Sequence, residues 1–221
     1  MKNTQFITTV RKTVSQNEKL TFIILGANCE YRQKNVGPKA LTKYNNKLLM
    51  HFQVDELRSN YQNSEIIYVS GFEHNKILKH KTNFRIVENT TYFDSGEFEQ
   101  VRLAIQNAET DKIVILSDTT TNLKFPDLNK ESKVFISDNA VSNPGCTQSK
   151  YIEHISYGLT NYITRCYYFT GNELNLLKKY LIENKEKKYK LFTFEIINDL
   201  IDKGGKFKTD KMDYTPYENI D

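Results

Sequence analysis

The chain has 221 residues, of which 38% are hydrophobic, and 31 basic and 27 acidic side chains give it a formal net charge of +4. This length suits one domain with a substantial core, and the apolar content argues against a disordered chain. The charge is small and dispersed, which argues against the concentrated basic surface of a nucleic-acid-binding protein.

Three widely spaced cysteines, Cys29, Cys146 and Cys166, indicate neither a disulfide framework nor a cysteine metal site. The four histidines also lack metal-ligand spacing. No apolar run approaches the ~20 residues of a membrane helix, and the N-terminus lacks the apolar segment of a signal peptide. We therefore expect a cytoplasmic protein with no membrane partner.

The N-terminal segment predicts a short amphipathic helix ahead of the main fold. Within residues 3–17, four apolar side chains recur at helical spacing: Phe6, Ile7, Val10 and Val14. Their shared face could cover a sheet or assemble copies of the chain into a homo-oligomer. We assign residues 1–20 to this segment and 21–221 to one domain, because no repeat or low-complexity linker marks a further boundary.

From residue 21 onward, apolar runs typical of strands alternate with segments of helical periodicity. Strands are predicted over 21–25, 65–70, 84–87 and 112–116, and helices over 48–60, 73–80 and 98–108. A polar loop is expected from Gly26 to Asn46. Repeated strand–helix units favour right-handed crossovers, so we predict an α/β fold with three layers, α/β/α, and a mostly parallel sheet.

The second half of the chain is less regular. Strands are predicted over 133–137, 151–157 and 163–169, and helices over 174–181 and 192–201, the last stopping at Gly204-Gly205 before a short strand. Ligands of such sheets bind beyond the carboxyl ends of the strands. The candidate site is therefore expected at these ends: Gly26–Arg32, Gly71, Glu88–Asn89 and Ser117–Asp118.

The segment after the first strand reads Leu25-Gly26-Ala27-Asn28-Cys29-Glu30-Tyr31-Arg32 and is followed by Pro38-Lys39-Ala40-Leu41. It resembles the signature of nucleotidyltransferases with the Rossmann-like GT-A (nucleotide-diphospho-sugar transferase) fold, which reads L-A-A-G-x-G-[ST]-R and then P-K-x-L. Several residues fall on family positions: Leu25, Ala27, Arg32, Pro38, Lys39 and Leu41. Others depart from it, because Asn28 and Glu30 replace the glycines and Tyr31 replaces Ser or Thr.

The resemblance implies a loop whose backbone N–H groups approach a triphosphate, with fixed positive charge beside it. It makes Lys39 and Arg32 the catalytic candidates, Lys39 at the α-phosphate and Arg32 at the β- and γ-phosphates. Ala27 and Asn28 are implied to bind the nucleotide. A carboxylate at Glu30 would repel phosphate, and Glu adopts positive φ less readily than glycine. The alternative is a chance turn with a surface lysine and a solvated arginine.

The resemblance also implies a Mg²⁺ site made by two aspartates. Asp118 follows the strand that ends at Leu116, where the family carries a metal-binding Asp. Mg²⁺ is typically held by one or two carboxylates plus substrate phosphates. The closing Tyr217–Asp221 is similar to the family's final E-I-D segment, so Asp221 is assigned as the second ligand. A turn cap at Asp118 and a plain chain end at Asp221 are the alternatives.

Two further segments resemble family motifs. Asn89 and Tyr92 match the family's N-x-x-Y after the third strand, which implies that they shape the nucleotide and acceptor sites. Glu195 resembles the family glutamate near the acceptor, and its alternative is a charge favoured at a helix N-terminus. Gln100 stands roughly where many members have a serine, and no role is assigned to it.

The resemblance spans about residues 21–221. It implies Mg²⁺-dependent transfer of a nucleoside monophosphate from an NTP, CTP being one option, to a phosphorylated sugar or alcohol, with release of pyrophosphate. The alternative is a non-catalytic relative that keeps the fold as a binding or structural module, which Asn28, Glu30 and Ser117 favour. A glycosyltransferase of the same fold ranks last, because Ser117-Asp118-Thr119 lacks a D-x-D motif.

Overall fold

The computed structural model describes residues 19–28, 37–186, 190–215 and 217. The amphipathic helix predicted over residues 3–17 lies outside the described residues, as do Arg32 and Asp221. The expectations for these three parts of the chain therefore stay predictions.

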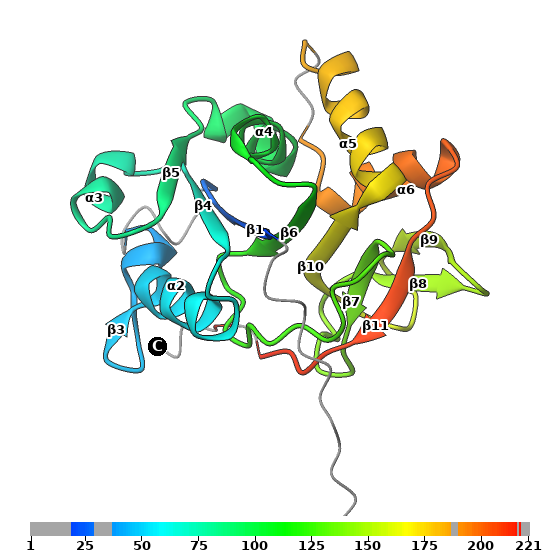
Figure 1. The fold of residues 1–221 in the computed structure, drawn as a ribbon, viewed down its shortest axis with the longest axis horizontal. Helices are drawn as coiled ribbons and strands as arrows, with labels where there is room; N and C mark the ends of the chain where they lie inside the picture. The colour runs from blue at the N-terminus through cyan, green and yellow to red at the C-terminus, as the bar shows by residue number, and fades with distance from the viewer. Residues whose placement is uncertain (1–18, 29–36, 187–189, 216, 218–221) are drawn as a thin grey trace, which may run out of the picture.

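A seven-stranded sheet in the order β11-β7-β10-β6-β1-β4-β5 forms the centre of the molecule (Figure 1). Its strands are β1 (Thr21–Gly26), β4 (Glu65–Ser70), β5 (Arg85–Glu88), β6 (Lys112–Ser117), β7 (Lys133–Ile136), β10 (Ile163–Thr170) and β11 (Lys208–Lys211). Strand β10 is antiparallel to its neighbours β6 and β7, whereas the other neighbouring pairs are parallel. This confirms the mostly parallel sheet with the first strand near its centre.

Helices cover both faces of the sheet. They are α2 (Leu49–Asn60), α3 (His74–Lys79), α4 (Tyr92–Asn107), α5 (Gly171–Glu183) and α6 (Thr193–Asp202). Figure 1 shows α2 on one side of the sheet and α4 and α5 on the other. One buried cluster joins α4, α5 and α6 to the sheet, and a second joins α2 and α3 to it. The predicted three layers are therefore confirmed.

The alternation of side chains along β1 explains why the core has two parts. Ile23 and Leu25 enter the cluster under α4, whereas Phe22 and Ile24 enter the cluster under α2. Because both faces are covered, the whole run has to be apolar. Burial of each such side chain contributes about 1.5–3 kcal/mol to folding.

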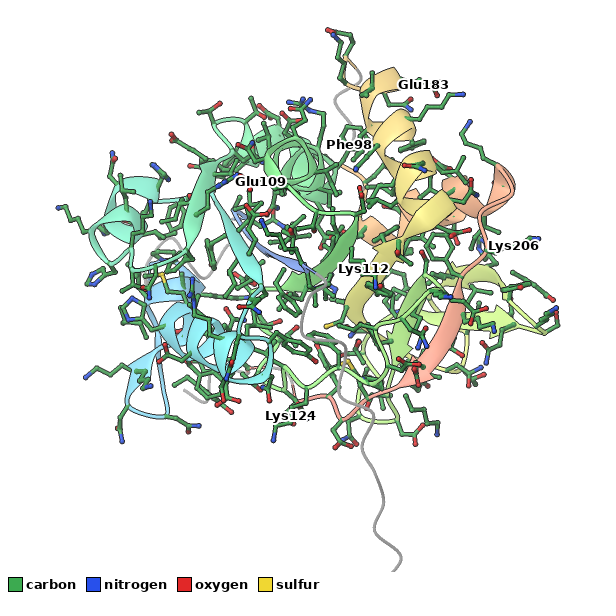
Figure 2. All side chains as sticks on the ribbon, viewed as in Figure 1. Phe98, Glu109, Lys112, Lys124, Glu183 and Lys206 are labelled. Atoms are coloured by element: carbon green, nitrogen blue, oxygen red, sulfur yellow. The ribbon has the colours of Figure 1, made fainter. Side chains whose placement is uncertain are left out.

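Helix α4 illustrates how the helical layer packs. Phe98 lies between α4 and α5 (Figure 2), and its ring meets that of Tyr180 edge to face with 6.1 Å between the centroids. The helix begins at Tyr92, earlier than predicted. After its first turn, Gly96 interrupts the helical geometry with φ 55° and ψ −150°. Such a conformation suits glycine, and it hides the first turn from a periodicity count.

Two hairpins lie outside the main sheet, β2 (Lys43–Tyr44) with β3 (Lys47–Leu48), and β8 (Gly145–Gln148) with β9 (Ile152–Ser156). The first corrects the plain loop predicted up to Asn46: it turns at Asn45 and Asn46, both with positive φ. Two-residue strands are too short to produce an alternating pattern. The strand predicted over 151–157 is confirmed as β9, which pairs with β8.

In the described part of the chain, none of the helices combines the length and the apolar character that a membrane span requires.

Candidate functional site

The segments beyond β1, β4, β5 and β6 meet at one edge of the sheet, here called the carboxyl edge (26–28, 70–72, 88–89 and 117–118). Three backbone hydrogen bonds link them: Asp118 N–H to Leu25 O at 3.4 Å, Phe72 N–H to Ala27 O at 3.2 Å, and Asn89 N–H to Ser70 O at 2.7 Å. The structure therefore brings the predicted site residues Ala27, Asn89 and Asp118 together.

Gln100 of α4 fastens the start of the loop after β1. Its fully buried side chain accepts a hydrogen bond from the Ala27 backbone N–H at 3.0 Å and donates one to Asn28 Oδ1 at 2.8 Å. The sequence had assigned no role to Gln100. A contact between residues 73 positions apart leaves no local pattern from which to predict it.

Asp118 stands in a turn that is fixed from the α2 side. The fully buried Gln53 donates from its amide nitrogen to Asp118 O at 3.0 Å and to Thr120 O at 2.9 Å. On the other side of Asp118, the hydroxyls of Ser117 and Thr119 lie 2.9 Å apart. These bonds hold the backbone of the turn and so set the position from which the carboxylate extends.

Lys39 lies in a short 3-10 helix, η1 (Lys39–Leu41), which packs on the α2 side of the sheet. Its neighbour Ala40 is buried in the cluster that contains Leu116, two positions before Asp118. The Lys39 carbonyl accepts hydrogen bonds from the backbone N–H and the hydroxyl of Thr42, at 3.0 and 2.6 Å. The element that carries Lys39 and the strand that leads to Asp118 thus share one face.

The C-terminal segment reaches the same region. The Tyr217 backbone N–H donates to Thr119 O at 2.7 Å, and the Tyr217 ring meets that of Tyr44 with 5.7 Å between centroids. One end of this segment is therefore held between the β2–β3 hairpin and the turn of Asp118. Tyr217 precedes Asp221, the predicted second metal ligand, by four positions.

Asn89 is fully buried and builds the turn that starts α4. Its Oδ1 accepts hydrogen bonds from the N–H and the hydroxyl of Thr91, at 3.0 and 3.1 Å, and its Nδ2 donates to Ser95 Oγ at 3.2 Å. Tyr92 packs over Gly71, where a methyl group would lie 2.6 Å from Tyr92 Cβ. Asn89 thus shapes the carboxyl edge, and its contact with a nucleotide stays a prediction.

Glu195 caps the start of α6. Its Oε2 accepts a hydrogen bond from the Phe192 backbone N–H at 2.7 Å, which agrees with the alternative of a favourable charge at a helix N-terminus. Glu97 ties the same turn to α4, since its Oε2 accepts from the N–H and the hydroxyl of Thr193, both at 2.7 Å. Among the described residues, no hydrogen bond links Glu195 to the carboxyl edge.

Arg165 is a further candidate that sequence reasoning missed. It precedes Cys166, which pairs with Leu116 near the end of β6. Its φ is +57°, where the register of β10 against β7 shifts. Non-glycine residues in this region carry strain and cluster at functional sites. No residue pattern reveals such an angle, so the sequence offered no signal for it.

The surroundings of Arg165 keep it charged. Its guanidinium lies 5.8 Å from the centroid of the Phe192 ring. Burial lowers the pKa of Arg165, but electrostatic interactions with Glu97 and with three nearby tyrosines raise it. The net effect is a raised pKa. Arg165 therefore provides fixed positive charge on the strand next to β6.

The described residues contain no group of three or more His, Cys, Asp or Glu side chains placed to hold a metal ion. A magnesium ion that arrives with a nucleotide needs fewer, since it takes one or two carboxylates and keeps several waters. Asp118 supplies one such carboxylate, and the side chain of Gln53, whose amide nitrogen bonds to Asp118 O, has an Oε1 that is buried without a hydrogen-bond partner.

Comparison with known proteins identifies the fold. No family model matches the sequence, and no curated protein matches it. Solved structures match well: CTP:phosphocholine cytidylyltransferase from Streptococcus pneumoniae has a TM-score of 0.68 at 16% identity, covering 88% of this chain and 90% of that one.

Two other matches are of the same kind. The nucleoside-diphosphate-sugar pyrophosphorylase from Vibrio cholerae RC9 has a TM-score of 0.65 at 16% identity, with 87% and 91% covered. The inositol-1-phosphate CTP transferase from T. maritima has a TM-score of 0.65 at 15% identity, with 86% and 84% covered. The chain therefore has the nucleotidyltransferase fold that its motifs resemble.

Proposed function

We propose that this chain is a nucleotidyltransferase, which transfers a nucleoside monophosphate from an NTP to a phosphorylated sugar or alcohol. CTP is the first nucleotide to test, because two of the similar structures are named as CTP-dependent transferases. Mg²⁺ is the expected metal.

One observation carries the proposal. Ala27, Asn28 and Asp118, from two separate motifs of the resemblance, lie at the carboxyl edge: Gln100 bonds to Ala27 and Asn28, and the Asp118 backbone N–H donates to Leu25 O, two positions before Ala27. Ligands of open α/β sheets bind at this edge. A nucleotide held beside Asp118 would therefore meet the loop after β1.

The reaction needs no protein nucleophile. An oxygen of the acceptor phosphate attacks the α-phosphorus of the NTP, a new P–O bond forms, and the bond to the β-phosphate breaks with release of pyrophosphate. When bound at Asp118 and Asp221, Mg²⁺ would neutralise charge on the phosphates. Lys39 would stabilise negative charge at the α-phosphate, and Arg32 would hold the outgoing phosphates. Catalysis then rests on positioning and fixed charge.

The direct test measures pyrophosphate release with each NTP, MgCl₂, and phosphorylated acceptors such as phosphocholine, inositol 1-phosphate and glucose 1-phosphate. We expect turnover with at least one pair, and a loss of roughly 100-fold or more in Asp118→Asn and Lys39→Met. Lys47→Met is the matched control, because Lys47 forms an exposed ion pair with Asp55. Equal losses in Lys39→Met and Lys47→Met would remove Lys39 from the mechanism.

The alternative of a non-catalytic binding module has a specific observation in its favour. Asn28 replaces a family glycine, and its side chain is tied to Gln100 instead of leaving bare backbone. Nucleotide-dependent thermal stabilisation without pyrophosphate release from any acceptor would support that alternative.

A further inference from the structure

Tyr68 of β4 fills a space beneath the carboxyl edge. It pairs with Ile24 of β1, and its ring and hydroxyl reach Gly26, two positions further along the same strand. A methyl group on Gly26 would lie 2.0 Å from the Tyr68 hydroxyl oxygen. The signature quoted above has alanine at this position, and its methyl group would leave no room for the hydroxyl. Gly26, which has no side chain, therefore accommodates Tyr68.

The Tyr68 hydroxyl has no hydrogen-bond partner although the residue is fully buried. It is one of four such side-chain atoms among the described residues. An unmet polar group of this kind reduces stability. Phenylalanine would fill the same volume without that cost, so packing alone does not explain a tyrosine here.

The Tyr68 hydroxyl lies near the backbone to which Asp118 is bonded. The Asp118 backbone N–H bonds to Leu25 O, adjacent to Gly26, and the hydroxyl lies against Gly26. A second unmet atom, Gln53 Oε1, belongs to the amide that bonds to the Asp118 carbonyl. Two side chains with an unsatisfied polar atom, Tyr68 on β4 and Gln53 on α2, thus pack around the backbone that holds Asp118.

The Tyr68 hydroxyl is protonated and can therefore donate a hydrogen bond. Burial raises its pKa well above 10.0, and the charge of Asp118 raises it further. A tyrosine hydroxyl is in any case neutral at physiological pH and carries one proton to donate.

We propose that the Tyr68 hydroxyl is a positioning group that donates a hydrogen bond to an oxygen of the metal–triphosphate complex held at Asp118. The oxygen belongs to a phosphate or to a water bound to the metal. The hydroxyl has no partner in the protein because its partner arrives with the nucleotide. This inference rests on the proposed function.

The test combines Tyr68→Phe with a matched control, Tyr168→Phe. Tyr168 is also fully buried in the cluster under α2, but its hydroxyl donates to Asn129 O at 2.7 Å. Melting temperatures are measured without ligand. Affinities are then measured by calorimetry for CTP with MgCl₂ and for tripolyphosphate with MgCl₂, a probe that lacks a base.

In Tyr68→Phe we expect an unchanged or higher melting temperature and roughly tenfold weaker binding of both probes. In Tyr168→Phe we expect a lower melting temperature and unchanged binding. Wild-type affinity in Tyr68→Phe would overturn the inference, and so would a melting temperature as low as that of Tyr168→Phe. Failure of the wild type to bind either probe would instead contradict the proposed function.

Discussion

The buried side chain of Gln100 accepts a hydrogen bond from the backbone N–H of Ala27. This contact couples α4 to the first residues beyond β1, where the candidate nucleotide site begins. The same amide group donates to Asn28 Oδ1, so one side chain orients two consecutive residues of the loop.

Gln100→Met should weaken both the fold and the site, because it leaves the Ala27 N–H buried without an acceptor. We expect a loss of about 1–3 kcal/mol in the free energy of unfolding, measured by urea denaturation. Nucleotide affinity should fall as well. Gln106→Met on the same helix is the control, since Gln106 is exposed and should change stability by less than about 0.5 kcal/mol. Equal stability of the two variants would contradict the role given to Gln100.

Gly26 and Tyr68 should show energetic coupling. Gly26→Ala forces a methyl group against the Tyr68 ring and hydroxyl and should destabilise the fold by about 1–3 kcal/mol. Tyr68→Leu removes the obstruction but leaves a cavity, at a cost of about 2–4 kcal/mol. The double variant should lose less than the sum of the two, because the methyl group fills part of that cavity. A double-mutant cycle by urea denaturation measures the coupling, and strict additivity would disprove the contact.

The sequence predicted most of the fold because its signals are local. The apolar run Phe22–Leu25 and the stripe from Phe98 to Ile105 each show the periodicity of the element that they form. The order of the predicted strands also indicated that Ala27, Asn89 and Asp118 would lie at one edge of the sheet, as they do, whereas their roles there stay predictions. Gln100 and Arg165 were missed because the first acts through a contact distant in sequence and the second through a backbone angle.

The ion pair between Lys133 and Asp210 should respond asymmetrically to mutation. Their charged atoms lie 3.0 Å apart, and the Lys133 side chain is 8% exposed whereas that of Asp210 is 32% exposed. Asp210→Ala leaves the buried cation without a carboxylate, although Lys133 Nζ still donates to Asp127 O, and should cost about 3 kcal/mol. Lys133→Met removes the buried charge, and water can still reach Asp210, so its cost should be under about 1 kcal/mol. Urea denaturation of both variants measures the two costs. A larger cost for Lys133→Met than for Asp210→Ala would show that the pair stabilises the fold only through packing.

Alkaline pH should destabilise the protein from about pH 9 upward, because buried acidic groups resist ionisation in the fold. Burial raises the pKa of Cys166 from 9.0 to about 11 and that of Tyr168 from 10.0 to about 12. Between the unfolded and the folded pKa of each group, the unfolded chain releases a proton that the folded chain keeps. The contribution of Cys166 is therefore fully present below pH 9 and is lost as pH rises through 11, and that of Tyr168 is lost between pH 10 and 12. Each group contributes a slope of at most about 1.4 kcal/mol per pH unit. Denaturation midpoints from pH 8 to 10.5 should therefore decline, and Cys166→Ala should flatten the decline between pH 9 and 10.5. An equal slope in this variant would show that other groups cause the loss.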